Sequence, residues 1–141
     1  MTNYDQKRVL GIILAGGKSR RFGVGDKFFQ KLDGETLLSR VIERIVTQVD
    51  ALIINSNSDS SKFSDYPYDI IPDIIPGYAG PLAGILTGME WAKECFPEYK
   101  WIATFAADAP FVPLDCVDKM LNAVVSEDTN IVCAASGGRT H

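Results

Sequence analysis

Residues 9–17 read VLGIILAGG, a short apolar run rich in β-branched residues that ends at two glycines. Such a run is typical of a strand inside a parallel sheet, because both faces of that strand are covered. We therefore predict a buried strand over residues 9–15. The glycine-rich loop that follows leaves the carboxyl end of this strand, where α/β folds hold phosphate groups on backbone N–H groups.

The rest of the chain alternates between helical and strand patterns. Apolar residues recur with helical spacing over three ranges: 36–49, 82–96 and 113–125. Short apolar runs predict four further strands, at residues 51–55, 69–72, 101–107 and 131–135. Parallel neighbours need crossover connections, so this alternation predicts a mostly parallel sheet with helices on its faces. The expected fold is α/β, a Rossmann-like three-layer sandwich.

Composition limits the classes of protein to consider. A chain of 141 residues with 46% hydrophobic and 23% charged residues is expected to form one globular domain, over residues 1–141. Its formal net charge of -4 argues against nucleic acid and anionic membranes as partners, since both select basic faces. The three cysteines show no metal-ligand spacing and are expected to be reduced, buried thiols.

The two ends of the sequence give two further expectations. The apolar stretch near the N-terminus is only about seven residues long, too short for a signal peptide or a membrane span, so we expect a cytoplasmic protein. The last residues, 137–141, follow a predicted strand without a closing helix. This ending predicts that the C-terminal part of the domain is missing.

The loop after the first strand gathers positive charge in a chain that is acidic overall. Its basic residues, with one just beyond it, are Lys18, Arg20, Arg21, Lys27 and Lys31. Two familiar phosphate loops do not match, because the dinucleotide fingerprint needs glycine at position 18 and the Walker loop needs it at position 12. Convergent Lys and Arg side chains with backbone N–H groups suit a triphosphate and a leaving pyrophosphate. The alternative is a surface turn with solvated charges.

Residues 14–23, LAGGKSRRFG, followed by Asp26-Lys27, resemble the signature LAGGxSxRMGxDK of the molybdenum cofactor guanylyltransferases, within the wider nucleotidyltransferase superfamily. Phe22 stands where the signature has Met, and the spacing from Gly23 to Asp26 is one residue longer. Neither change removes a hydrogen-bond donor or a charge. The resemblance implies a three-layer fold of the nucleotidyltransferase type.

This resemblance also implies a reaction and its catalytic residues. GMP would pass from GTP to molybdopterin carrying molybdenum, forming the molybdopterin guanine dinucleotide cofactor and releasing pyrophosphate. Arg21, Lys27 and Asp108 would be catalytic, with Mg²⁺ as cofactor and Asp108 as its ligand. A carboxylate leaving an apolar strand beside phosphates is suited to hold Mg²⁺, whereas the alternative is that Asp108 caps a turn before Pro110.

The resemblance assigns the GTP contacts to several segments of the chain. Taken alone, Asn55 and Asp73 would be turn residues, and Gly80-Pro81 would be a turn that opens a helix. By resemblance they contact the nucleotide, and residues 80–84 face guanine. The full implied set is Leu14, Ala15, Gly16, Gly17, Lys27, Asn55, Asp73, Gly80, Pro81, Leu82 and Asp108.

Two other functions fit the same residues. One is a molybdenum cofactor cytidylyltransferase or another nucleotidyltransferase, although that group more often carries AAG in the first loop. The other is a nucleotide-binding module without catalysis, such as a regulatory partner in cofactor delivery. The implied partners are GTP and molybdopterin, with delivery proteins or molybdoenzymes as further candidates.

Overall fold

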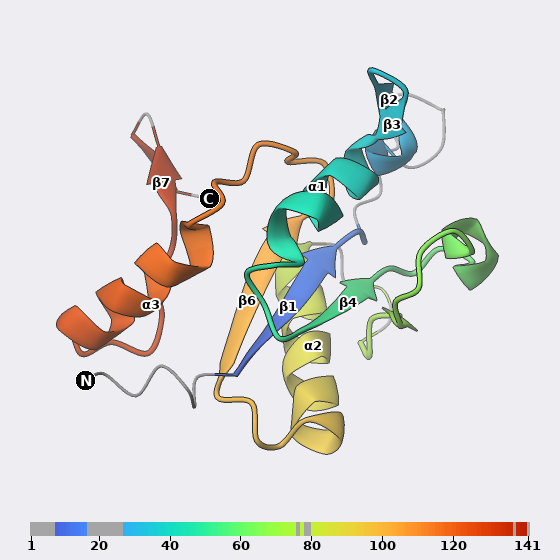
Figure 1. Ribbon diagram of the computed structural model, residues 1–141. Coiled ribbons are helices and arrows are strands. Elements are labelled where there is room, and N and C mark those ends of the chain that lie inside the picture. The colour runs from blue at the N-terminus through green and yellow to red at the C-terminus, as the bar shows by residue number, and fades with distance from the viewer. Residues whose placement is uncertain (1–7, 17–26, 76, 78–79, 137, 141) are drawn as a thin grey trace.

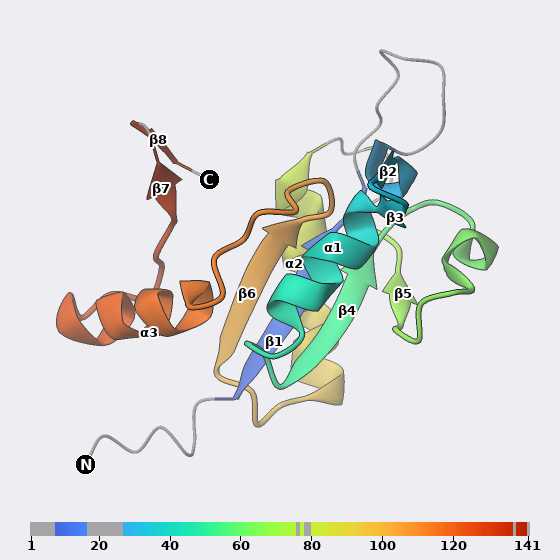
Figure 2. The same cartoon turned by 45° about the horizontal axis from the view of Figure 1, so that its top comes forward.

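The centre of the molecule is a parallel sheet, described by a computed structural model that covers residues 8–16, 27–75, 77, 80–136 and 138–140. Its four strands run in the order β5-β4-β1-β6 (Figures 1 and 2). Their bounds are β1 (Val9–Leu14), β4 (Ala51–Asn55), β5 (Ile70–Ile71) and β6 (Trp101–Ala106). In the register, Leu14 pairs with Asn55 on one side and with Ala106 on the other. The carboxyl ends of three strands therefore meet at one edge, which we call the carboxyl edge.

Helices cover both faces of this sheet. Helix α1 (Leu37–Ile45) lies on one face and α2 (Pro81–Cys95) on the other (Figures 1 and 2). The α1 side is packed with Val9, Ile13 and Ile54, among other residues, and the α2 side with Leu10, Ile12 and Ile53. Strand β1 thus buries side chains on both faces, as its unbroken apolar run predicts. The expected three-layer α/β sandwich is confirmed.

The helix boundaries follow from local chemistry. Thr36 caps α1, and its Oγ1 accepts a hydrogen bond of 3.0 Å from the backbone N–H of Ser39. Helix α1 ends at Ile45, earlier than the predicted range. Helix α2 begins with Pro81 directly after Gly80, whose φ of 126° is a conformation that favours glycine.

Small elements that the sequence analysis did not predict lie between β1 and β4 and between β4 and β5. Strands β2 (Lys31–Leu32) and β3 (Glu35–Thr36) form a hairpin around Asp33 and Gly34, both with positive φ. This Asp-Gly pair suits a type I′ turn. The 3-10 helices η2 (Lys27–Phe29) and η3 (Ser60–Phe63) pack through a cluster of three rings, those of Phe28, Phe29 and Phe63.

The C-terminal third departs from the prediction at one strand. Helix α3 (Cys116–Ser126) forms as expected, but residues 131–134 have no regular structure and the predicted strand over 131–135 is wrong. Instead β7 (Ala135–Ser136) pairs antiparallel with β8 (Arg139–Thr140), and this hairpin lies apart from the sheet (Figure 2). Ile131 is 79% exposed, so the apolar run is not placed on a sheet that would bury it.

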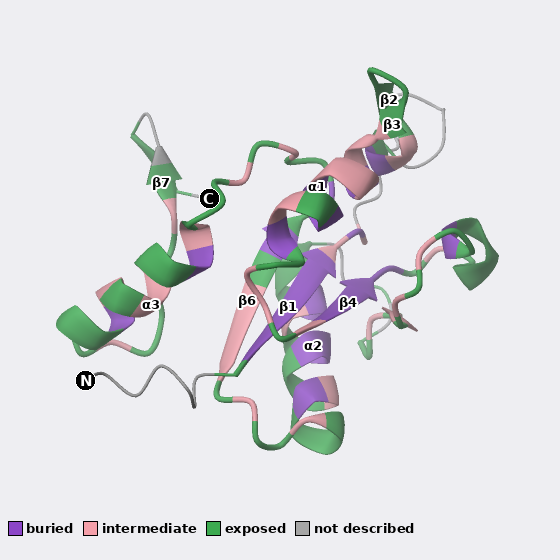
Figure 3. Ribbon diagram, viewed as in Figure 1, coloured by how far each residue is buried: buried purple, intermediate pink, exposed green. Residues whose placement is uncertain are grey.

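Buried residues are concentrated in β1, β4, α1 and α2, whereas α3 buries only Val117 and Val124 (Figure 3). The expectation of buried cysteines is wrong for Cys95 and Cys133, which are exposed, and Cys116 is half-buried. All three are free thiols. Burial and the nearby Asp115 carboxylate raise the pKa of Cys116. Within the described ranges, no helix has the length and apolarity needed to cross a bilayer.

Candidate functional site

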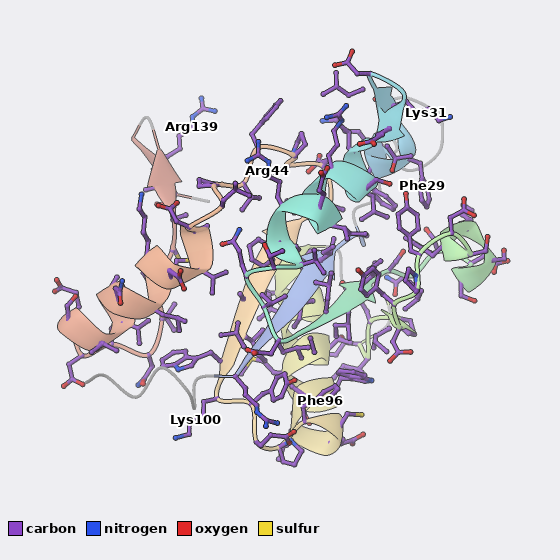
Figure 4. All side chains as sticks on the ribbon, viewed as in Figure 1. Phe29, Lys31, Arg44, Phe96, Lys100 and Arg139 are labelled. Atoms are coloured by element: carbon purple, nitrogen blue, oxygen red, sulfur yellow. The ribbon has the colours of Figure 1, made fainter. Side chains whose placement is uncertain are left out.

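The carboxyl edge continues the sheet hydrogen bonding past the ends of the strands. The backbone N–H of Ala15 donates to the carbonyl of Asn55 at 2.8 Å, and that of Ala107 donates to the carbonyl of Leu14 at 3.2 Å. These bonds fix the start of the first loop between its two neighbours. In Figure 4 the labelled Phe29 and Lys31 lie toward this edge, and Phe96 and Lys100 lie at the opposite end of the molecule. Gly17 and Arg21 of the predicted site fall outside the described residues.

Three side chains next to β4 and β5 form what we call the amide–carboxylate cluster, which consists of Asn55, Asn57 and Asp73. Nδ2 of Asn55 donates to Oδ1 of Asp73 at 2.9 Å, and Nδ2 of Asn57 donates to Oδ2 of Asp73 at 2.9 Å. The backbone N–H of Asp73 donates in turn to Oδ1 of Asn57 at 2.8 Å. Asn55 is only 2% exposed, and its Nδ2 also donates to the carbonyl of Ile71 at 3.0 Å. Side chains of the protein thus hold the carboxylate of Asp73 on both oxygens.

The first turns of α2 pack against this cluster. A Cβ at Gly84 would collide with the amide oxygen of Asn55 and would lie 2.9 Å from Cδ2 of Leu14. Glycine at this position therefore lets the helix approach the carboxyl edge. The predicted residues Gly80, Pro81 and Leu82 form the start of the same helix, and the Leu82 side chain is 79% exposed.

Thr87 ties the segment after Asp73 to α2. Its hydroxyl accepts a hydrogen bond of 3.0 Å from the backbone N–H of Ile74 and donates to the carbonyl of Ala83 at 2.8 Å. Thr87 is only 1% exposed, so this buried hydroxyl has both a donor and an acceptor as partners. The amide–carboxylate cluster is thereby connected to the helix as well as to the sheet.

Lys27 and Asp108 form a second group of predicted residues, on the other side of β1. Lys27 opens η2, Asp108 follows β6, and Nζ of Lys27 lies 3.5 Å from Oδ2 of Asp108. The two side chains are 57% and 42% exposed, so the surrounding water screens their attraction. The ring cluster of η2 and η3 anchors the chain next to Lys27, because Phe28 stacks on Phe63 with centroids 5.9 Å apart.

The side chains of the described residues limit how Mg²⁺ could be bound. In the part of the chain that the structure describes, no cluster of three or more Asp, Glu, His or Cys residues could hold a metal by itself. Mg²⁺ is, however, commonly bound by one or two carboxylates together with water and substrate phosphates. Asp108, with a half-exposed carboxylate beside a cation, fits this shared mode and not an all-protein cage.

Sequence reasoning assigned no role to Asn57 or Thr87, two contributors to this edge. A signal for Asn57 was present, since residues two apart on an extended segment point to the same side and Asn55 was already in the predicted set. Gly84 lay inside the segment expected to face guanine, but its contact with Asn55 is not encoded locally. The Thr87 contact joins elements that are separate in sequence.

The fold and the edge together define the class of the protein, an α/β protein of the nucleotidyltransferase type. Amide, carboxylate and ammonium groups gather where parallel strands end, the usual ligand position in such folds. A model of the MobA-like NTP transferase domain matches residues 11–141. The chain belongs to this family.

Similar proteins agree with this assignment. The chain is 44% identical over 141 residues to a molybdenum cofactor guanylyltransferase of Bradyrhizobium sp. (strain ORS 278), covering 100% of the chain and 66% of that protein. It is 42% identical over 130 residues to the protein of that name from Rhodopseudomonas palustris (strain HaA2), covering 92% of the chain and 61% of the relative. The chain therefore spans less than two thirds of the length of these relatives.

A solved structure supports the fold independently of close sequence similarity. The crystal structure of Rv0371c from Mycobacterium tuberculosis H37Rv superposes with a TM-score of 0.65 at 18% identity. The match covers 85% of this chain and 62% of that one. At this identity the likeness concerns the fold alone.

Proposed function

We propose that this chain carries the GTP-binding part of a molybdenum cofactor guanylyltransferase. In this reaction GMP passes from GTP to the terminal phosphate of molybdopterin carrying molybdenum, and the molybdopterin guanine dinucleotide cofactor forms. The observation that carries the proposal is the placing of a Lys27–Asp108 pair and an amide–carboxylate cluster along one carboxyl edge. The names of the 44% and 42% identical relatives supply the substrates.

The chemistry is a direct displacement at the α-phosphorus of GTP. An oxygen of the molybdopterin phosphate forms a bond to this phosphorus while the bond to the bridging oxygen of the β-phosphate breaks, and pyrophosphate leaves. No covalent enzyme intermediate is needed, so the protein only positions the reactants and neutralises charge. In this proposal Lys27 and Arg21 neutralise the triphosphate and the departing pyrophosphate. Backbone N–H groups of Gly16 and Gly17 bind phosphate oxygens.

Asp108 is the residue that would hold Mg²⁺ in this proposal. When bound, the ion would offset negative charge on the phosphate oxygens. Lys27, 3.5 Å from the same carboxylate, would then exchange its contact with Asp108 for contacts with phosphate. Both groups are exposed enough to change partners without disturbing the core.

The nucleoside would lie at the other end of the edge. Asn55 and Asp73 supply fixed polar atoms there, and the glycine at position 84 keeps the start of α2 close to Asn55. Backbone groups of residues 80–84 would read the edge of the guanine base. The polar atoms and the backbone together give a site for one nucleoside, with the triphosphate directed toward Lys27.

GMP transfer from α-labelled GTP to molybdopterin, measured with pyrophosphate release, tests this proposal. We expect Arg21→Ala to lower turnover strongly while the melting temperature stays close to that of the unmodified chain. A thermal-shift panel of GTP, CTP, ATP and UTP with Mg²⁺ accompanies it, because a ligand that binds only the native state raises its apparent stability. Preference for CTP would contradict the guanylyltransferase assignment, and GTP binding without transfer would indicate a binding module.

A further inference from the structure

Asn57 makes a reciprocal pair of hydrogen bonds with Asp73. Its Nδ2 donates to Oδ2 of the carboxylate at 2.9 Å, and its Oδ1 accepts from the backbone N–H of residue 73 at 2.8 Å. The Asn57 side chain is exposed, so it contributes little to the apolar core. Its contacts are directed at one residue, and that residue is a predicted nucleotide contact.

The Asp73 carboxylate is oriented from both sides. Asn55 donates to Oδ1 and Asn57 donates to Oδ2, each at 2.9 Å. An ionised carboxylate only accepts hydrogen bonds and has about four lone-pair sites, so about two remain for a ligand. Because both oxygens are held, those remaining sites point in fixed directions before a ligand arrives.

We propose that Asn57 is a positioning residue for nucleotide recognition, acting through the carboxylate of Asp73. The inference rests on the proposed function, in which Asp73 contacts the nucleotide. The ligand groups concerned are N–H or O–H donors of the nucleoside, since a carboxylate has no proton to offer. Because the carboxylate is already fixed, less conformational entropy is lost when the nucleotide binds.

The backbone around Asp73 is held by bonds that do not involve Asn57. The N–H of Ser56 donates to the carbonyl of Ile71 at 3.1 Å, and the N–H of Ile74 donates to Thr87 Oγ1 at 3.0 Å. Loss of the Asn57 side chain should therefore free the Asp73 carboxylate, while the backbone around Asp73 stays folded. This difference separates a positioning role from a purely structural one.

A double-mutant cycle on GTP affinity tests the proposal. The dissociation constant of GTP with Mg²⁺ is measured by titration calorimetry for the unmodified chain, Asn57→Ala, Asp73→Ala and the double variant. We expect Asn57→Ala to weaken binding about fivefold or more in the presence of Asp73, and to have no further effect once Asp73 is alanine. Asp59→Ala is the matched control, since it removes a bond of 3.0 Å to the N–H of Ser61 in the same loop without touching Asp73.

A second variant keeps the test valid if Asn57→Ala lowers stability. Exchanging the two residues, with Asn57→Asp and Asp73→Asn together, keeps one amide facing one carboxylate. Melting temperature should recover toward that of the unmodified chain, while GTP affinity should stay at the Asp73→Ala level because position 73 no longer carries a carboxylate.

The outcomes separate this inference from the proposed function. Unchanged affinity in Asn57→Ala, or an equal loss with and without Asp73, would overturn the positioning role while GTP binding by the chain stands. Absence of saturable GTP binding in the unmodified chain would overturn both.

Discussion

The two ends of the candidate site are held in different ways. At the nucleoside end, Asp73 accepts hydrogen bonds of 2.9 Å from both Asn55 and Asn57, and Asn55 is 2% exposed. At the phosphate end, Lys27 and Asp108 meet through one ion pair of 3.5 Å, with side chains 57% and 42% exposed. The first arrangement is fixed by the protein, whereas the second can be exchanged for other partners.

The two kinds of contact differ in the free energy that they contribute. Hydrogen bonds to charged groups contribute about 1.5–3 kcal/mol each, whereas an exposed ion pair contributes about 0–1 kcal/mol. In the proposed function, the nucleoside end would therefore be organised before binding, which would favour selectivity for one base or sugar. The phosphate end would lose little free energy when Lys27 and Asp108 turn to a triphosphate and a metal ion.

The largest effect is expected at the phosphate end. Asp108→Asn should lower GMP transfer by about 100-fold or more, since it removes a charge that acts on the reacting phosphates. The free energy of unfolding should change by less than about 1 kcal/mol, because the Lys27 contact is exposed. Activity assays and denaturant unfolding measure the two quantities.

The control for this variant is another exposed ion pair of the chain. Asp115 and Lys119 of the α3 region lie 3.1 Å apart, with side chains 57% and 74% exposed. Asp115→Asn should leave both transfer and stability nearly unchanged. Equal loss of transfer in Asp108→Asn and Asp115→Asn would remove Asp108 from the site.

The nucleoside end should respond to a single methyl group on α2. Gly84→Ala places a Cβ against the amide oxygen of Asn55, which must move, so GTP affinity should fall about tenfold as the fixed geometry is lost. Gly88→Ala is the matched control on the same helix, where the Cβ meets Ile12 in the core. That variant should lose about 1–3 kcal/mol of stability through overpacking and keep its GTP affinity. The reverse pattern would contradict the role given to Gly84.

Thr87→Val is expected to lower the stability of the same end. The substitution leaves the N–H of Ile74 without its acceptor, at a cost of about 1–3 kcal/mol in unfolding free energy. Thr129→Val removes two exposed hydrogen bonds, in which the hydroxyl donates to the carbonyl of Ile131 at 3.1 Å and accepts from its N–H at 3.4 Å, and the effect should stay within about 0.5 kcal/mol. Equal stability of the two variants in thermal unfolding would show that Thr87 does not hold this segment.

The smallest expected effect concerns the thiols, which belong to neither end of the site. Cys95 and Cys133 are exposed, whereas burial raises the pKa of Cys116 and leaves less thiolate there at a given pH. Iodoacetamide at pH 8 should therefore label Cys116 last, as followed by peptide mass spectrometry. Labelling of the two exposed thiols should not change GTP affinity, and a change would place one of them near the nucleotide.

The sequence predicted those features that depend on neighbouring residues. The apolar run of β1 and the proline that opens α2 each carry a local signal, so the parallel sheet and its flanking helices could be expected. The Asp33-Gly34 turn of the β2–β3 hairpin also had such a signal, which was not used. The strand expected over 131–135 was wrong because an apolar run forms a strand only where a neighbouring strand pairs with it.

Contacts between distant segments could not be predicted in this way. The resemblance assigned Lys27 and Asp108 to one site, but only the fold brings their side chains within 3.5 Å. Only the fold, likewise, brings together Asn57 and Asp73, which belong to different connections of the sheet. Their chemistry is visible in the sequence, but their partnership depends on the order of β5, β4, β1 and β6.

In the proposed function, a single nucleotide spans the carboxyl edge from a fixed nucleoside end to an exchangeable phosphate end. A crystal structure of the chain with GTP and Mn²⁺ tests it most directly, because the anomalous signal locates the metal. We predict the nucleoside against Asn55 and Asp73, and the metal on Asp108 with Lys27 turned toward phosphate. Nucleotide bound away from this edge, or metal on another carboxylate, would contradict the claim.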